Sequence, residues 1–226
     1  MWIRYSLDWL LSFIATTLRM GAGGTGRPHS IANLPLTLYE FEGCPFCRIA
    51  REQVSASGVT VHVKPCPKGG KRFRPEVKDK GGKAQFPYLI DPNASDGEGA
   101  TEMYESGDIA AYVRREYGSG RPMIHGLGPL NLISSQFATL SRYASGILKT
   151  PAKSNEKPLR FFGAERSPSA RLVKETLCSM ELDYLWTSQA LDGQTLPRLE
   201  DENSDTAVTG GRAILNYLRK TYRSEE

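Results

Sequence analysis

The residues of this chain best suited to do chemistry are Cys44 and Cys47, the first and last residues of a Cys-Pro-Phe-Cys motif. Residues 36–41 precede the motif with the pattern of a strand, and residues 48–54 follow it with the pattern of a helix. A Cys-x-x-Cys motif at a strand-to-helix junction is typical of a dithiol redox site. The N-terminus of a helix stabilises a thiolate through its unpaired N–H groups, and the thiolate is the nucleophile in disulfide exchange. We therefore expect Cys44 to be the nucleophile and Cys47, one helical turn further on, to attack the mixed disulfide that results.

The composition is that of an ordinary globular protein. Of the 226 residues, 39% are hydrophobic and 24% are charged, and the net charge of +4 does not by itself indicate a nucleic-acid partner. Four cysteines with only one close pair do not resemble the disulfide framework of a secreted protein. They favour an intracellular location, in the cytoplasm or in an organelle such as a plastid, over secretion.

The first thirty residues contain an apolar segment that needs its own interpretation. Residues 9–18 are apolar but too short to span a bilayer, so no transmembrane segment is expected. A secretory signal is one alternative, because Arg4 precedes the segment and small residues follow it. We favour an amphipathic helix, since apolar residues repeat with helical spacing in two rows. These rows are Trp9, Phe13 and Thr17, and Leu10, Ile14 and Leu18.

The next ninety residues have the pattern of a thioredoxin fold. After the strand at 36–41 and the helix at 48–54, a strand is expected at 59–63 and a helix in the middle of the basic segment 64–83. Two strands at 85–90 and 101–104 and a helix at 106–117 complete the order. Ser106 has the residue type of a helix N-cap.

The last part of the chain repeats this pattern in a degenerate form. Residues 118–128 read as a linker rich in Gly and Pro, apolar residues from 130 to 147 have helical spacing, and residues 150–158 read as a second linker. A strand at 159–162 then leads into Ser167-Pro-Ser-Ala170, which stands where the Cys-Pro-Phe-Cys motif stood. Thr195-Leu-Pro-Arg-Leu199 matches Gln85-Phe-Pro-Tyr-Leu89, and the intervening segment is shorter by most of a helix.

An internal repeat of this length predicts an α/β protein with two tandem thioredoxin-like domains, the second shortened, preceded by an N-terminal helix. The expected divisions are 1–30 (amphipathic helix and Gly-rich linker), 31–118 (the domain with the cysteines), 119–157 (a linker containing a helix) and 158–226 (the degenerate copy).

The motifs together resemble a known family. Residues 38–48, 65–69, 85–93 and 103–109 are similar to glutaredoxin-like proteins that carry a glutathione S-transferase N-terminal domain, in particular a tandem type, and to the type-two prostaglandin E synthase. The resemblance is strong over residues 36–118 and weaker over 159–222.

The resemblance implies how the site would bind glutathione. Pro87 would be cis and face the cysteine pair, and the backbone of Phe86 would pair with the cysteinyl part of glutathione. Phe46, the aromatic third residue of the motif, is similar to its counterpart in glutaredoxins. Glu105 and Ser106 match the motif that holds the γ-glutamyl end, where helix N–H groups meet the carboxylate and Glu105 meets the ammonium.

The remaining cysteines, His62 and the basic segment have simpler interpretations. A zinc site would need two more ligands beside the cysteine pair, and Cys66, His62 and Cys178 form no second close pair, so no metal is expected. Cys66 is either a regulatory thiol or a small apolar residue, and Cys178 is expected in the core. The basic segment 64–83 is either a solvated face or a positive funnel for glutathione or an acidic partner. In the second copy, Ser167 and Ala170 replace the cysteines, and Gly210-Gly211 stand where Glu105-Ser106 would be.

The leading functional hypothesis is a glutathione-linked thiol–disulfide oxidoreductase. Glutathione would be its co-substrate, and protein disulfides or glutathionylated proteins would be its partners. Two alternatives from other classes stay open. One is a glutathione-dependent transferase or isomerase acting on a small apolar substrate, which would need an apolar cleft beside Cys44. The other is a non-catalytic interaction protein that uses the tandem fold as a scaffold.

Overall fold

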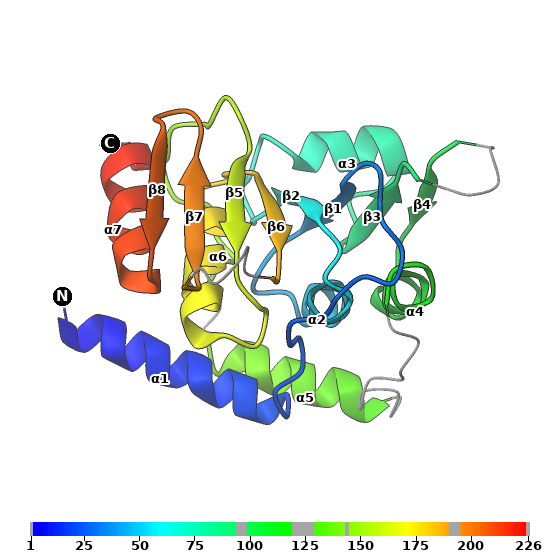
Figure 1. Ribbon diagram of the computed structural model, residues 1–226, viewed down its shortest axis with the longest axis horizontal. Helices are drawn as coiled ribbons and strands as arrows, with labels where there is room; N and C mark the ends of the chain where they lie inside the picture. The colour runs from blue at the N-terminus through cyan, green and yellow to red at the C-terminus, as the bar shows by residue number, and fades with distance from the viewer. Residues whose placement is uncertain (1, 94–98, 119–128, 143–144, 190–194, 225–226) are drawn as a thin grey trace.

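A single eight-stranded sheet spans the described part of the protein, with the strand order β4-β3-β1-β2-β6-β5-β7-β8 (Figure 1). The structure is a computed structural model that describes residues 2–93, 99–118, 129–142, 145–189 and 195–224. The first half of the sheet and its helices are β1 (Leu36–Glu40), α2 (Pro45–Ser57), β2 (Val61–Pro65), α3 (Arg74–Gly81), β3 (Tyr88–Asp91), β4 (Thr101–Met103) and α4 (Ser106–Glu116). The second half comprises β5 (Leu159–Phe162), α6 (Pro168–Ser179), β6 (Tyr184–Thr187), β7 (Arg198–Asp201), β8 (Thr206–Thr209) and α7 (Gly211–Tyr222). Two further helices, α1 (Trp2–Leu18) and α5 (Pro129–Leu140), each precede one half.

The two halves of the sheet have the same pattern of strand pairing. In the first half β1 pairs parallel with β2 and antiparallel with β3, which pairs antiparallel with β4. In the second half β5 pairs in the same three senses with β6, β7 and β8 in turn. The halves join where β2 runs antiparallel to β6, with His62 opposite Leu185. This mixed α/β arrangement confirms a thioredoxin-like fold.

Details of the two halves also correspond. Both the Phe86–Pro87 and the Leu196–Pro197 peptide bonds are cis. A buried aspartate at the end of the third strand of each half accepts hydrogen bonds from two tyrosine hydroxyls of the last helix. These groups are Asp91 with Tyr112 and Tyr117, and Asp201 with Tyr217 and Tyr222. The same polar anchor therefore fixes α4 and α7 to their strands.

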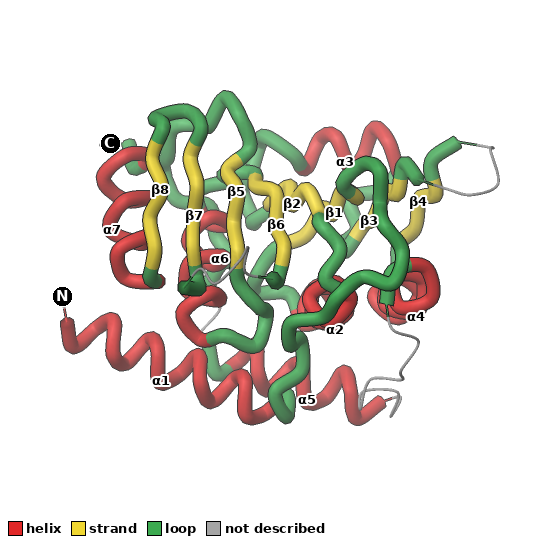
Figure 2. Tube along the Cα trace, in the orientation of Figure 1, coloured by secondary structure: helices red, strands yellow, loops and turns green. Residues whose placement is uncertain are grey.

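Helices α1 and α5 each pack on the opposite half. Figure 2 shows them as an outer layer beyond α2 and α6, away from the sheet. Helix α1 contacts α6, α5 contacts α2, and the two helices contact each other. The polar contacts match across the halves: Ser12 donates to the carbonyl of Pro168 at 3.1 Å, and Ser135 donates to the carbonyl of Pro45 at 2.6 Å. Both helices are thus integral to the packing, and the segment expected as a linker holds one of them.

The orientation of α1 differs from the expectation for an amphipathic helix. Its buried side carries the polar residues Ser12 and Thr16, which both accept hydrogen bonds from the Arg171 guanidinium at 3.0 Å. The two apolar rows instead face outward, and Leu10 and Phe13 are about half exposed. The reason is that the buried arginine of α6 needs acceptors, and the polar side of α1 supplies those of its Nη1 while the Glu165 carbonyl accepts from its Nη2.

Several boundaries also shift. β2 begins at Val61, two residues later than expected, and Val59 is buried in the hydrophobic core between the end of α2 and the start of β2. Helix α4 begins at Ser106, but the N-cap position is occupied by Glu105, so the expectation of Ser106 as N-cap is wrong. None of the described helices is long and apolar enough to cross a membrane.

Candidate active site

Cys44 lies at the N-cap of α2, between the end of β1 and the first turn of the helix. Its backbone is extended (φ −104°, ψ 120°), and Pro45 follows at the first helical position, where its missing N–H costs nothing. The Cys44 Sγ accepts a hydrogen bond from the backbone N–H of Cys47 at 3.3 Å. Gly43 is needed here, since a Cβ would stand 2.1 Å from the Ile147 side chain.

The two cysteines have opposite acidities. The pKa of Cys44 is lowered to about 7, chiefly by the hydrogen bond from the Cys47 thiol, with help from the Cys47 and Phe46 N–H groups and from Arg51. Burial opposes this shift but does not cancel it. Burial raises the pKa of Cys47 well above its ordinary value. Near neutral pH about half of the Cys44 population is therefore thiolate, while Cys47 keeps its proton.

A buried cluster of charges lies behind the cysteine pair. The Arg51 guanidinium pairs with three carboxylates: Glu40, Glu42 at 3.1 Å and Glu165 at 3.4 Å. Lys174 of α6 pairs with Glu42 at 3.3 Å and with Glu165. All five side chains have at most 1% of their surface exposed. The cluster links the two halves, and its Arg51 contributes to the lowered pKa of Cys44.

Burial raises the pKa of Glu40 to about 7, against the opposing effect of Arg51. Sequence reasoning did not identify this cluster. The available signal was that, when the Cys-Pro-Phe-Cys motif is aligned with Ser167-Pro-Ser-Ala170, Glu42 and Arg51 stand in register with Glu165 and Lys174.

The sheet brings the predicted glutathione residues to the same edge as the cysteines. β1 and β3 pair with Tyr39 opposite Tyr88, so Pro87 lies beside the end of β1 that leads to Cys44. β3 and β4 pair with Leu89 opposite Met103, so Glu105 and Ser106 follow at that edge too. The topology therefore gathers the motif, the cis proline and the start of α4, whose sequence positions are far apart.

The aromatic residues of this edge are arranged around Arg74. Phe86, which precedes the cis proline, meets the Phe41 ring edge-on at a centroid distance of 6.0 Å. The Arg74 guanidinium lies 4.8 Å from the centroid of Phe86 and 6.0 Å from that of Phe41. Phe46 is 44% exposed at the first turn of α2. Arg74 thus places a positive charge at the site. Sequence reasoning did not single it out, because it lies within a long run of basic residues.

Glu105 has a left-handed backbone (φ 65°, ψ 119°), which non-glycine residues seldom adopt. Its carboxylate accepts a hydrogen bond from the Gln85 side-chain amide at 2.6 Å. Ser106 is buried at the first helical position, where backbone N–H groups lack carbonyl partners within the helix. This geometry suits a carboxylate ligand at the start of α4.

The basic segment is partly paired rather than fully solvated. Lys64 pairs with Glu76 at 2.6 Å, and Arg72 pairs with Asp183 at 3.0 Å across the junction of the two halves. The residues that remain exposed are Lys68, Lys71, Lys78, Lys80 and Lys83. The expectation of a solvated face holds for these lysines only.

The second half keeps the backbone of the site without its thiols. The Ser167 Oγ accepts from the backbone N–H of Ala170 at 3.3 Å, as Cys44 does from Cys47. Gly210 precedes α7 with φ 93° and ψ 130°, close to the conformation of Glu105. Among the described residues, no group of three or more His, Cys, Asp or Glu side chains could hold a metal ion.

Only Cys44 should react with iodoacetamide in the native protein near neutral pH. Cys44 is 5% exposed and its pKa is lowered, whereas Cys47, Cys66 and Cys178 have no exposed surface and burial raises the pKa of each. Peptide mass spectrometry after a short alkylation should find the label on Cys44, and on the other three only when the protein is unfolded first. Labelling of Cys66 at the same rate as Cys44 would contradict this assignment.

The comparisons with known proteins agree with the geometry of the first half. Residues 38–122 match the family model for the glutathione S-transferase N-terminal domain, which supports a thioredoxin-fold domain of this type and implies binding of glutathione. The curated proteins contain no match to the chain, and neither do the solved structures.

Proposed function

We propose that this protein is a glutathione-linked thiol–disulfide oxidoreductase with Cys44 as its nucleophile. The observation that carries the proposal is a thiol with a pKa of about 7 at a helix N-cap, on the sheet edge that also holds a cis proline. A pKa near the ambient pH is the optimum for an attacking thiol, because it combines a large thiolate fraction with high intrinsic nucleophilicity.

The reaction begins when the Cys44 thiolate attacks the glutathionyl sulfur of a mixed disulfide. The S–S bond of the substrate breaks, its thiolate leaves and takes up a proton, and a Cys44–glutathione disulfide forms. A second glutathione thiolate then attacks this disulfide, which releases oxidised glutathione and restores the Cys44 thiolate. The net reaction exchanges one disulfide for another: the mixed disulfide and one glutathione thiol give the free substrate thiol and oxidised glutathione, so the incoming glutathione is oxidised as the substrate sulfur is reduced.

Cys47 offers a second route to the same products. It would attack the Cys44–glutathione disulfide, release glutathione and leave a Cys44–Cys47 disulfide, which external glutathione then reduces. The buried Cys47 must first lose its proton, and burial raises its pKa. The route through a second glutathione is therefore the faster one in this proposal.

The glutathione would be held by residues of the sheet edge. The backbone of Phe86 before cis Pro87 would pair with the cysteinyl unit, with Phe46 alongside. The start of α4 at Ser106 would bind the γ-glutamyl carboxylate, and Glu105 would pair with the ammonium. The Arg74 guanidinium, 4.8 Å from the Phe86 centroid, would supply positive charge for the remaining carboxylate. The transferase alternative would need an apolar cleft beside Cys44; within the described residues, the cavities of about 480 and 280 Å³ are lined by residues other than Cys44.

The second half is proposed to be a degenerate copy that serves as a scaffold. It repeats the strand order, the cis proline and the aspartate–tyrosine anchor of the first half. We include α1 in the first copy and α5 in the second, since Arg19 after α1 pairs with Glu52 of α2, and Arg142 after α5 pairs with Glu175 of α6.

The pH dependence of Cys44 alkylation, measured with and without glutathione, tests this function. The pKa of Cys44 is lowered, so the rate should rise as pH increases through about 7, one to two pH units below an ordinary thiol. Bound glutathione should slow the reaction, because it covers the thiol. Glu105→Gln is the matched control for the ligand: it removes the charge proposed to pair with the ammonium of glutathione, so it should weaken glutathione protection but leave the pH midpoint in place. A midpoint near that of a free thiol, together with no protection by glutathione, would refute the proposal.

A further inference from the structure

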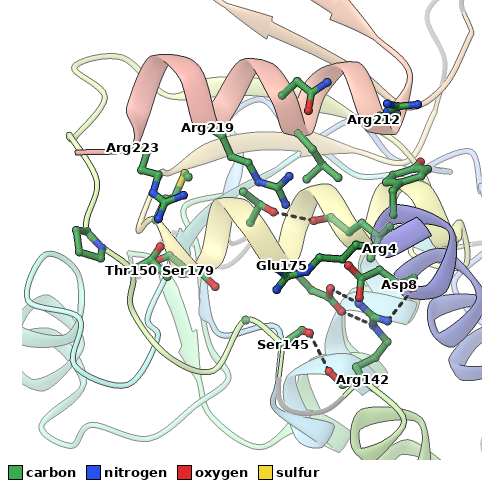
Figure 3. A pocket seen from close by; sticks show the side chains of 18 residues that line it. Arg4, Asp8, Arg142, Ser145, Thr150, Glu175, Ser179, Arg212, Arg219 and Arg223 are labelled. Atoms are coloured by element: carbon green, nitrogen blue, oxygen red, sulfur yellow. Dashed lines mark hydrogen bonds and ion pairs between the residues drawn. The ribbon is translucent and has the colours of Figure 1, made fainter. Parts of the chain in front are cut away.

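A cavity of about 480 Å³ lies on the second half of the protein, between α6, α7 and the N-terminal part of α1 (Figure 3). Its volume is in the range of sites that bind small molecules. The described residues that line it belong to α1, α6, α7 and the segment between α5 and β5. None of them is a cysteine of the motif or a residue proposed above to bind glutathione. The cavity is therefore separate from the candidate active site.

The wall of this cavity carries an excess of positive charge. Five arginines and two carboxylates line it, which leaves three positive charges in excess. One of the arginines, Arg142, is paired with Glu175 at 2.7 Å. Three others form no ion pair and donate no side-chain hydrogen bond within the described residues: Arg4, Arg219 and Arg223. Three guanidinium groups thus line one cavity without an acceptor among the described residues.

These three arginines come from two helices and extend into the same space. Arg219 and Arg223 are four residues apart at the C-terminal end of α7, so their side chains leave the helix on the same side. Figure 3 shows both of them extending towards α6, while the Arg4 side chain extends from α1 into the space between these helices. The cavity therefore gathers like charges, whose mutual repulsion is unfavourable unless an anion lies between them.

Arg4 has the least favourable position of the three. It lies in the first turn of α1, where the helix dipole disfavours a cation, whereas the dipole of α7 favours Arg219 in its last turn. Asp8, one turn further along α1, also lines the cavity but forms no ion pair with Arg4. A bound anion would supply the counter-charge that Arg4 lacks among the described residues.

The first half does not repeat this cluster. The tyrosines of the two aspartate anchors align α4 with α7, and in this alignment Arg114 corresponds to Arg219 while Gly118 corresponds to Arg223. Arg114 lines neither of the two described cavities. The cationic cavity thus belongs to the half in which serine and alanine stand in place of the cysteines.

We propose that this cavity binds a small organic molecule that carries two phosphate groups. A guanidinium is always charged, and its planar fork of N–H donors matches phosphate oxygens in pairs. One phosphate monoester carries a charge of about −1.5 to −2, which is less than the excess of the cavity, so two phosphate groups match it better.

The rest of the wall suits the organic part of such a ligand. Leu172, Met180 and Leu215 line the cavity, and their side chains are otherwise packed into the protein. Ligand sites combine an apolar lining of this kind with a few convergent polar groups. The arginines would fix the phosphate groups, and the apolar side chains would contact the body of the molecule.

Isothermal titration calorimetry of the full chain with inorganic pyrophosphate tests the proposal. Pyrophosphate should bind saturably at one site per chain, more tightly than inorganic phosphate, and its affinity should fall as salt is raised. Arg219→Gln and Arg223→Gln should each weaken binding about tenfold, since each removes a charged donor from the cavity. Excess glutathione should not compete, because its proposed site lies on the first half.

Arg114→Gln is the matched control. It removes the same charge from the corresponding position of α4, so it should bind pyrophosphate as the wild type does. Arg219 and Arg223 are exposed and Arg114 is half-buried, and none of the three forms an ion pair within the described residues. Circular dichroism should therefore show the wild-type fold in all three variants.

Three results would overturn the proposal. The first is no saturable binding of pyrophosphate. The second is an equal loss of affinity in Arg114→Gln and Arg219→Gln, which would reduce the effect to net charge. The third is citrate binding as tightly as pyrophosphate and with the same dependence on Arg219, which would assign the cavity to carboxylates instead.

Discussion

Replacing Cys44 with serine should abolish the reduction of a glutathionylated peptide, to below about 1% of the wild-type rate, because a serine hydroxyl does not ionise near neutral pH. The lost group is a thiol at the helix N-cap whose pKa is lowered to about 7. The rate of reduction is measured by coupling the released oxidised glutathione to glutathione reductase and recording the consumption of NADPH.

Cys47→Ser is the matched control for this experiment. It makes the same sulfur-to-oxygen replacement at the other cysteine of the motif, but it leaves intact the route in which a second glutathione releases glutathione from Cys44. The activity of Cys47→Ser should therefore stay within about tenfold of the wild type. Its Cys44 thiol should also titrate at higher pH, because the Cys47 thiol makes the largest contribution to the lowered pKa of Cys44. Full activity in Cys44→Ser would refute the proposed function, whatever the activity of Cys47→Ser.

The second large effect concerns stability. Arg51→Met should lower the free energy of unfolding by about 3–5 kcal/mol, the cost of leaving buried charges uncompensated. Arg51 has no exposed side-chain surface and pairs with Glu40, Glu42 and Glu165. Its loss leaves Glu42 paired with Lys174, Glu165 paired with Lys174 and with Arg48 at 3.9 Å, and Glu40 without a paired cation among the described residues. Urea unfolding followed by circular dichroism measures the change.

Arg115→Met provides the contrast. Arg115 also pairs with a glutamate, Glu116 at 2.6 Å, but its side chain is 67% exposed, so the change should cost less than about 1 kcal/mol. A double variant, Arg51→Met/Glu40→Gln, should recover part of the lost stability, since it removes one uncompensated carboxylate. If Arg51→Met and Arg115→Met unfold at the same urea concentration, the buried cluster does not stabilise the protein.

Much of the first half could be predicted from the sequence, because the relevant signals are local. The strand before Cys44 and the helix after it are read directly from the order of apolar and polar residues. The cis geometry at Pro87 followed from the resemblance carried by its neighbouring residues. The N-cap at Glu105 was missed, because its left-handed backbone is set by the junction of β4 and α4 rather than by residue type.

The contacts between the halves could not be predicted in the same way. Arg51 and Glu165 lie far apart in the sequence, and nothing local to either residue indicates a buried partner. Helical spacing likewise predicts that α1 is a helix with two different sides, but it does not say which side faces the protein. That depends on the acceptors required by Arg171, a residue of the other half.

In our proposal that the second half is a degenerate copy of the first, the crossed packing of α1 and α5 corresponds to a domain-swapped homodimer fused into one polypeptide. Helix α1 packs on the second half and α5 packs on the first, so neither half contains all of its own packing partners. Unfolding of one half would therefore expose a face of the other. Such a fusion frees one subunit to lose its catalytic groups while it still completes its neighbour. Ser167, which keeps the hydrogen-bond geometry of Cys44 but not its chemistry, fits this division of labour between an active and a supporting subunit.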